Sequence, residues 1–393
     1  LTSLGVAWDR DRHGRPALGL EGGHSRRRIV HAGGAATGRR ITRALSARAA
    51  ESRLITVLEG TRVDSLLSDG SSCRGVHLAD GSSILSNSVI LATGGAAAMW
   101  KRTSNPLGTV GRGMVVAHAA GAALADLEMV QFHPTALADG SDRDGMLITE
   151  AIRGEGATLV DADGQRFVDE LAPRDEVALA IHHRMLETGT NSVAMDMRSV
   201  DPKLFPNVVE SLAGCGIDST ADLVPVAPAA HYVMGGIETD LHGQSTLPGL
   251  FAIGETACTG LHGANRLASN SLTECFVFGR RAALASLDTQ TASSAGSVTQ
   301  VTCEGPIRPT PETREALWSS AGLVRDKQGL ERLLEDPHPL ARLVALSALT
   351  REESRGAHRR SDFPDTDASL DGQRTALAPG GDCTICLLYT SDA

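Results

Sequence analysis

The chain has 393 residues, enough for about two or three domains with substantial cores. Its net charge of −10 argues against a nucleic-acid or anionic-membrane partner. Hydrophobic residues make up 41% and charged residues 21%, and no apolar run approaches the ~20 residues of a membrane span, so we expect a soluble, cytoplasmic protein.

The seven cysteines do not form the regular spacing of a disulfide framework. Most are widely scattered, which is typical of thiols in a reducing compartment. Cys383 and Cys386 form the only C-x-x-C pair, and a single pair without a partner pair is a poor zinc signal. We therefore expect no metal site.

The first part of the chain predicts a helix followed by a small sheet. Residues 39–51 place Ile41, Leu45 and Ala49 on one helical face. Short apolar runs separated by Ser/Asp/Gly turns follow, and they predict an antiparallel meander that leads into a buried strand. That strand ends at Gly94 and Gly95, where a missing side chain permits close approach of a ligand. A Gly/Ala-rich helix is expected over 113–125.

Residues 146–216 are more charged and look like an inserted lobe, and strand–loop–helix order returns from residue 225. LFAIGE (250–255) predicts a buried strand that stops at a Gly-Glu pair. HGANRLASNSL (262–272) predicts a polar loop, with a helix that begins near 269–271. Ligands lie at the carboxyl ends of strands in α/β proteins, and helix N–H groups favour negative charge. This stretch therefore predicts a cofactor site.

The C-terminal part predicts a linker and helices. Residues 285–303 have low complexity and are expected to form a linker. Thr310-Pro311 is a typical helix start, and Leu340, Leu343, Val344 and Leu349 predict an amphipathic helix that ends near Gly356. The last residues, 376–393, fit no regular pattern, and we expect a disordered or non-native tail.

No G-x-G-x-x-G follows a strand near the start of the chain. A dinucleotide-binding βαβ unit needs such a loop to seat the pyrophosphate. We therefore expect that the front of a nucleotide-binding domain is missing, and no charged-then-apolar leader is seen.

Several cationic side chains lie on or near glycine-rich loops and could hold a small dicarboxylate. Such a substrate needs two cationic sites, and arginine binds a carboxylate in a bidentate way. The alternative is that each side chain makes a local pair or faces solvent. The candidates are His24, His133, Arg153, Arg174, His231 and Arg266.

The motifs HYVMGGI (231–237), GLFAIGE (249–255) and HGANRLASNSL resemble flavoproteins of the succinate dehydrogenase and fumarate reductase superfamily. Within that superfamily the chain is most similar to the L-aspartate oxidases, from Glu21 to Pro364. The resemblance implies an α+β protein with a Rossmann-like FAD-binding domain, an inserted capping domain and a C-terminal helical domain. The expected boundaries are 1–126 and 225–290 for the FAD-binding domain, 146–218 for the capping domain, and 305–364 for the helical domain.

The resemblance also implies roles for individual residues. His133, His231 and Arg266 match contacts to substrate carboxylates, and Thr149 and Glu150 match other positions of the substrate pocket. Arg174 matches the arginine that transfers a proton, although a free guanidinium hardly deprotonates. It would need a perturbed environment, or would act as a charge-stabilising donor.

Glu21 bears on the choice of substrate. Glu21 directly precedes the two glycines of EGGHSRRR, as in L-aspartate oxidases, and its carboxylate could pair with the substrate ammonium group. The alternative is that Glu21 is a surface glutamate in a loop. For non-covalent FAD, the resemblance implies that Glu255 contacts the ribityl chain and that the N–H groups of Ser271 and Leu272 face the flavin. Ser271 could also be a simple helix cap.

The implied reaction is oxidation of L-aspartate to iminoaspartate with hydride transfer to FAD, as the first step of de novo NAD biosynthesis. Oxygen or fumarate would be the electron acceptor, and quinolinate synthase would take the product. The alternatives are a soluble fumarate reductase or succinate dehydrogenase flavoprotein, or a non-catalytic remnant of the fold. Arg112 and Ala35 favour the remnant, since both stand where the superfamily commonly has aspartate.

Overall fold

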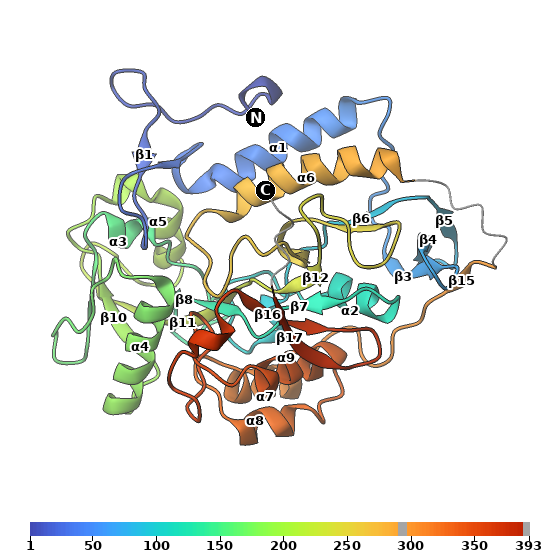
Figure 1. Cartoon of the computed structure of the whole chain (residues 1–393). Coiled ribbons are helices and arrows are strands. Elements are labelled where there is room, and N and C mark those ends of the chain that lie inside the picture. Colours follow the sequence, from blue (N-terminus) through green and yellow to red (C-terminus); the bar gives the residue numbers. More distant parts are fainter. Residues whose placement is uncertain (290–296, 388–393) are drawn as a thin grey trace. The chain divides into compact units, whose positions relative to one another are not determined.

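The structure, a computed structural model, describes residues 1–289 and 297–387. The chain divides into two compact units. Figure 1 labels the main helices and strands of both. Unit 1 comprises residues 1–61, 133–228 and 267–269, and unit 2 comprises 62–132, 229–266 and the described residues from 270 onward. Over the described ranges, no helix combines the length and the apolar character that crossing a membrane requires.

Unit 1 contains a two-stranded sheet, a four-stranded sheet and helices. The predicted helix over 39–51 is confirmed as α1 with Ile41 buried. The elements are η1 (Thr2–Leu4), β1 (Leu18–Gly19), β2 (Ile29–Val30), η2 (Gly34–Ala36), α1 (Thr37–Glu51), α3 (Ala151–Gly154), β9 (Thr158–Val160), α4 (Arg174–Thr188), β10 (Val193–Asp196), η4 (Pro202–Leu204) and α5 (Pro206–Ala213). β8 (Val130–Leu137) and β11 (Val224–Val233) cross the boundary between the units along the chain.

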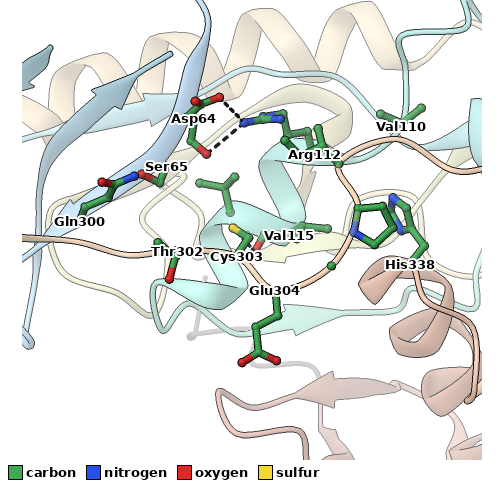
Figure 2. A pocket seen from close by; sticks show the side chains of 14 residues that line it. Asp64, Ser65, Val110, Arg112, Val115, Gln300, Thr302, Cys303, Glu304 and His338 are labelled. Atoms are coloured by element: carbon green, nitrogen blue, oxygen red, sulfur yellow. Dashed lines mark hydrogen bonds and ion pairs between the residues drawn. The ribbon is translucent and has the colours of Figure 1, made fainter. Parts of the chain in front are cut away.

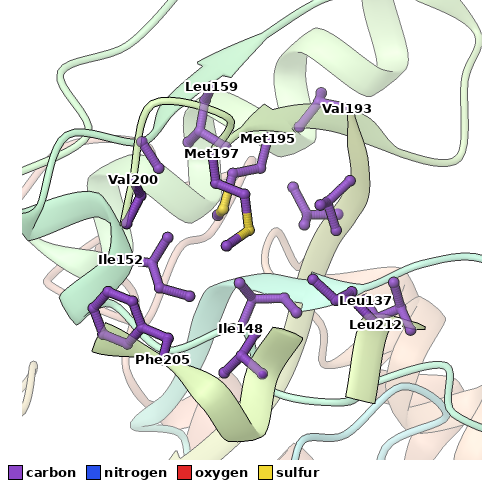
Figure 3. Packing of buried hydrophobic residues seen from close by; sticks show 14 of the residues in the cluster. Leu137, Ile148, Ile152, Leu159, Val193, Met195, Met197, Val200, Phe205 and Leu212 are labelled. Atoms are coloured by element: carbon purple, nitrogen blue, oxygen red, sulfur yellow. The ribbon is translucent and has the colours of Figure 1, made fainter. Parts of the chain in front are cut away.

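One hydrophobic core holds the 133–228 part of unit 1 together. The sheet order is β8-β11-β10-β9, with β10 antiparallel to both of its neighbours. Figure 3 shows apolar side chains from the strands and from the neighbouring segments meeting in one cluster. Met195, Ile148 and Ile152 in it are fully buried. Burial on this scale stabilises the lobe by roughly 1.5–3 kcal/mol for each large side chain.

Unit 2 contains three sheets and the remaining helices. Its elements are β3 (Val63–Ser68), β4 (Cys73–Leu78), β5 (Ser83–Leu85), β6 (Val89–Leu91), η3 (Ala97–Met99), α2 (Arg112–Ala119), β7 (Leu124–Ala125), β12 (Gly236–Glu238), β13 (Leu250–Ala252), η5 (Gly254–Thr256), β14 (Ala257–Cys258), α6 (Ser271–Ala285), η6 (Ser286–Asp288), β15 (Thr299–Gln300), α7 (Pro311–Ser320), α8 (Lys327–Leu333), α9 (Pro339–Thr350), η7 (Ala368–Leu370), β16 (Gln373–Leu377) and β17 (Cys383–Leu387). The mixed helix and sheet content confirms the predicted fold class.

Two short parallel strands set the geometry of the predicted cofactor site. β6 and β13 pair in register, with Leu250 opposite Val89 and Ala252 opposite Leu91. Because the strands are parallel, the glycines after β6 and the Gly-Glu pair after β13 leave at the same edge. β13 is fully buried, as predicted, whereas Ile90 of β6 is 38% exposed, so the strand that we expected to be buried is only partly so.

The predicted antiparallel meander is confirmed by β3, β4 and β5. The helix expected over 113–125 is α2, which ends earlier, at Ala119. Gly121 has φ of 104°, a left-handed conformation that terminates the helix. α7 begins at Pro311 with Thr310 as its side-chain cap, as predicted.

Three expectations about the C-terminal part need comment. α9 ends at Thr350 rather than near Gly356, because Arg351 turns to extended backbone and donates to Glu128. Residues 373–387, which overlap the expected disordered or non-native tail, form the β16–β17 hairpin of a five-stranded sheet. Within the expected linker, 290–296 lie outside the described residues, while Thr299–Gln300 pairs with β3.

Candidate active site

The edge of β6 and β13 brings together the residues predicted to bind the cofactor in unit 2. A Cβ atom on Gly95 would lie 2.1 Å from Oε1 of Glu255, so only glycine permits the carboxylate to lie there. Gly94 has φ of 77°, which also favours glycine. The backbone N–H of Val233 donates to Oε1 of Glu255 at 3.1 Å. Burial raises the pKa of Glu255 to about 7, against the opposing effects of that hydrogen bond and of the Arg266 charge.

The N-terminus of α6 has the properties that a flavin contact needs. Asn270 rather than Ser271 occupies the cap position, and the Asn270 side chain makes no capping hydrogen bond. The simple-cap interpretation of Ser271 is therefore wrong, and its Oγ instead accepts a hydrogen bond from Nε of Arg266. Uncapped N–H groups at a helix start attract negative charge or acceptor atoms. Together with Gly95 and Glu255, this end of α6 fits FAD.

Arg266 is a buried arginine held on several sides within unit 2. Its side chain donates to Ser271 and, through Nη1, to Oε1 of Gln131 at 3.1 Å. Its guanidinium carbon lies 4.7 Å from the centroid of the Tyr232 ring. A cation over an aromatic face is attracted by about 0.5–2 kcal/mol, more when water is excluded. These contacts present the guanidinium in one orientation, as recognition of a carboxylate requires.

His231 is half-buried near the end of β11. Its Nδ1 lies 2.7 Å from Oγ of Ser104, and its carbonyl accepts from the Asn105 side chain at 2.6 Å. These contacts fix both the ring and the backbone of His231. An oriented imidazole of this kind can donate to a substrate carboxylate.

Unit 1 brings Glu150 and Arg174 into direct contact, and adds Arg153. Nε of Arg174 donates to Oε2 of Glu150 at 2.6 Å, and Nη2 of Arg153 lies 3.2 Å from Oε1. All three side chains are almost completely buried. Sequence reasoning treated these residues separately, whereas the structure makes them one ion-paired group.

The charges of this group perturb one another. Burial acts to raise the pKa of Glu150, but the positive charges of Arg174 and Arg153 outweigh it and the pKa is lowered. Burial lowers the pKa of Arg153, with the charge of Glu150 acting in the opposite direction. The lowered pKa keeps Glu150 ionised between the two buried guanidinium groups.

The EGGHS motif packs against this group. The N–H of Gly22 donates to Oε1 of Glu150 at 3.0 Å, and a Cβ on Gly22 would lie 2.0 Å from the same oxygen. Glu21 is buried, and its Oε2 accepts a hydrogen bond of 2.6 Å from Ser269. Ser269 belongs to the ASN part of HGANRLASNSL, so two of the recognised motifs meet within unit 1. The alternative of a surface Glu21 is wrong.

The other predicted residues of unit 1 also have defined places. His133 lies in β8 and is buried, and its Nδ1 accepts from the N–H of Thr135 at 3.2 Å, which leaves Nε2 as the donor. Thr149 precedes Glu150 and is half-buried. His24 is also half-buried, and its Nε2 lies 2.9 Å from the carbonyl of Ala268.

Arg112, which departs from the superfamily pattern, has a partner in unit 2. Its Nη2 donates to the backbone carbonyl and to Oδ1 of Asp64, at 3.0 and 2.9 Å. Figure 2 shows the guanidinium directed at Asp64 on the wall of a cavity of about 200 Å³. None of the predicted site residues lines this cavity. Ala35, the other departure, lies in η2, and its side chain is outside the described part of the structure.

Sequence reasoning missed several residues of these groups. Arg153 was recognised only as a cation near a loop, and Gln131, Tyr232, His262 and Glu274 were not singled out. The signal was present, because Gln131 begins QFHPTAL, Tyr232 follows His231 and His262 begins HGANR. Glu274 lies three residues after Ser271, one helical turn away.

Comparison with known proteins adds family profiles and relatives. A profile described as FAD binding domain matches residues 1–272, and one described as fumarate reductase flavoprotein C-term matches 332–381. An L-aspartate oxidase from Mesorhizobium japonicum is 42% identical over 99% of this chain and 80% of its own length. Another, from Agrobacterium fabrum, is 44% identical over 96% of this chain and 77% of its own length.

Solved structures show the same relationship at the level of the fold. An Escherichia coli quinol fumarate reductase FrdA variant superposes with a TM-score of 0.85 at 27% identity, over 100% of this chain and 82% of the other. The Mycobacterium smegmatis Sdh1 structure with UQ1 gives a TM-score of 0.78 at 28% identity, over 98% of this chain and 78% of the other.

Proposed function

The chain belongs to the L-aspartate oxidase family of FAD-dependent flavoproteins, and from this membership we propose that it oxidises L-aspartate to iminoaspartate in NAD biosynthesis. The observation that carries the proposal is the match to L-aspartate oxidases along 99% of the chain. FAD, when bound, supplies the acceptor for the hydride that leaves the substrate α-carbon.

The proposed roles in unit 2 concern the cofactor and one end of the substrate. Glu255 and the glycines at the edge of β6 and β13 would hold the cofactor, and the N–H groups of Ser271 and Leu272 would face its flavin. His231 and Arg266 would bind a substrate carboxylate. Their oriented donors support this assignment, because pre-organised groups lose little entropy on binding.

The proposed roles in unit 1 concern the rest of the substrate and the proton. His133 would donate to a substrate carboxylate. Thr149, which directly precedes Glu150 in the sequence, would line the substrate pocket. Glu21 would accept from the substrate ammonium group. Converting an amine to an imine also releases a proton, and Arg174 would take it. The hydrogen bond from Nε of Arg174 to Glu150 supports this role, because the arginine could take a proton at Nη while its Nε–H proton passes to the carboxylate 2.6 Å away.

The finer parts of the proposal concern partners and domains. Oxygen or fumarate would be the electron acceptor, and quinolinate synthase would consume iminoaspartate. The lobe over 146–218 would be the capping domain that excludes water from the substrate, and its own compact core supports treating it as one body.

The test is anaerobic reduction of the FAD-loaded protein. Addition of L-aspartate should bleach the flavin absorbance, and addition of succinate should not. Bleaching by succinate alone would identify a succinate dehydrogenase or fumarate reductase flavoprotein, the alternative to which the superposed solved structures belong. Failure of the folded full-length protein to bind FAD would identify a non-catalytic remnant.

A further inference from the structure

The first turn of α6 carries a buried carboxylate, Glu274, whose side chain is 1% exposed. Its Oε1 accepts a hydrogen bond from Thr259 at 2.6 Å. Its Oε2 lies 2.8 Å from Nε2 of His262 and accepts from the hydroxyl of Tyr232 at 3.2 Å. A buried carboxylate with this many partners has one well-defined position, because any other rotamer leaves several polar groups unsatisfied.

Tyr232 contacts both Glu274 and Arg266 and so links the two side chains. The tyrosine is fixed at its backbone end by β11 and at its hydroxyl end by Glu274, so its ring has little freedom to rotate. His262 also contacts the ring edge-on, with the centroids 5.3 Å apart. The guanidinium of Arg266 lies over the Tyr232 ring, with its central carbon 4.7 Å from the ring centroid.

We propose that Glu274 is a positioning residue which, through Tyr232, sets the plane of the Arg266 guanidinium for binding a substrate carboxylate. The proposal rests on the role of Arg266 in the proposed function. Gln131 and Ser271 accept hydrogen bonds from two nitrogens of Arg266, and the Tyr232 ring adds a contact with the guanidinium itself. Because that ring is fixed, it favours one tilt of the guanidinium.

A purely structural role explains the arrangement less well. Burying a carboxylate costs several kcal/mol before its partners compensate, and apolar residues of similar size commonly stabilise a core as well or better. An acid in the first turn of a helix gains from the helix dipole, but an exposed acid would gain this too. Glu274 also accepts a hydrogen bond from the tyrosine hydroxyl beneath Arg266, and its partner His262 lies 3.3 Å from the same hydroxyl, which an apolar residue could not reproduce.

Two variants test the proposal in the FAD-loaded protein. Glu274→Gln keeps the shape of the side chain and removes its charge, and Tyr232→Phe keeps the ring and removes only the tethered hydroxyl. Each should raise the KM for L-aspartate and the Kd for fumarate about tenfold and lower kcat less. Fumarate cannot reduce an oxidised flavin, so calorimetry measures its binding without turnover. A crystal structure of each variant should show the guanidinium moved relative to residue 232.

A double-mutant cycle separates this proposal from its premise. If Glu274 acts through Arg266, Glu274→Gln should change the Kd for fumarate much less in the Arg266→Leu protein than in the wild type. A full effect in that background would overturn the positioning role alone. An unchanged Kd in the single variant Arg266→Leu would instead overturn the carboxylate role of Arg266, and the positioning role with it.

Glu353→Gln is the matched control. Glu353 is as buried as Glu274 and is ion-paired to Arg351 and Arg355, neither of which is a proposed site residue. This variant should lower the melting temperature without changing the Kd for fumarate. Equal effects of both variants on Kd would show that loss of any buried carboxylate loosens the site, and would overturn the proposal. Tyr232→Phe keeps the test decisive if Glu274→Gln does not fold.

Discussion

Arg266 combines burial, two side-chain hydrogen bonds and an aromatic face in one cation. We predict that Arg266→Leu lowers kcat/KM for L-aspartate about a thousandfold, because removing one partner of a buried charge pair costs roughly 2–5 kcal/mol. The flavin should remain bound, since the proposed cofactor contacts are made by Gly94, Gly95, Glu255 and the backbone N–H groups of Ser271 and Leu272, which the substitution leaves in place. Flavin absorbance and steady-state kinetics measure the two effects. Arg280→Leu, at an exposed position of α6, serves as the control, and wild-type kinetics in Arg266→Leu would contradict the assignment.

Glu21 allows a sharper test at the residue scale, because it concerns the choice of substrate. Glu21→Gln keeps an acceptor for Ser269 but loses the negative charge that would attract an ammonium group. We expect KM for L-aspartate to rise about tenfold or more, while the Kd for fumarate, which has no ammonium group, changes little. Glu51→Gln, at an exposed position, is the control. Equal losses for both ligands would mean that Glu21 only supports the structure.

At the scale of elements, the edge of β6 and β13 is the part of the site that depends most on close approach. Gly95→Ala would place a methyl group 2.1 Å from a Glu255 oxygen, so the carboxylate must move. We predict that FAD binding weakens at least about tenfold, measured by fluorescence titration. Gly108→Ala is the matched control, because a Cβ there meets no atom within 4 Å. Equal FAD affinity in the two variants would exclude a role for this edge.

Sequence patterns predicted this edge because its signals are local. Paired glycines after an apolar run, a Gly-Glu pair and a loop that leads into a helix are each complete within about ten residues. The start of α7 could be predicted for the same reason, since Thr310 caps the helix that Pro311 begins. The end of α9 was predicted wrongly because its cause is distant: Arg351 leaves the helix to bond Glu128, 223 residues away.

Convergence of side chains could not be predicted from such patterns. Gly22 is hydrogen-bonded to Glu150, 128 residues away in the sequence, and Glu21 is hydrogen-bonded to Ser269, 248 residues away. Periodicity contains no information on pairings over these separations, so only the resemblance pointed to a common site. The β16–β17 hairpin escaped prediction for a related reason, because short strands in a Gly/Pro-rich segment are stabilised by neighbours such as β7.

At the scale of the whole molecule, a buried ionic network ties the C-terminal segment of unit 2 to residues 126–128. Arg351 donates to Glu128 at 2.7 Å and to Glu353 at 2.8 Å, and Glu128 also accepts from Thr375. Asp126 accepts from the N–H of Thr375 at 3.2 Å and from the thiol of Cys258. Removing any one partner would leave an uncompensated buried charge, so the segment and the core should unfold together.

Asp126 should make the stability of this network depend on pH. Burial and the charge of Glu128 raise its pKa from 3.8 to about 7, although Arg351 and Arg374 act to lower it. Between pH 3.8 and about 7, Asp126 holds a proton in the folded protein that it has lost in the unfolded chain. Its contribution to the free energy of unfolding is therefore complete below about pH 4 and is lost as the pH rises to about 7, by at most about 1.4 kcal/mol per pH unit.

Asp126→Asn tests this linkage, and asparagine suits the site because residue 126 has φ of 54°, which asparagine tolerates well. The variant cannot titrate, so its melting temperature should rise relative to that of the wild type as the pH increases from 4 to 7, and the difference should level off above 7. Glu255, whose pKa also lies near 7, titrates in both proteins and cancels in the difference. Asp382→Asn, at an exposed position, should give a difference that does not vary with pH. A constant difference for Asp126→Asn as well would mean that Asp126 is ionised in the folded protein throughout this range, with Arg351 and Arg374 outweighing its burial.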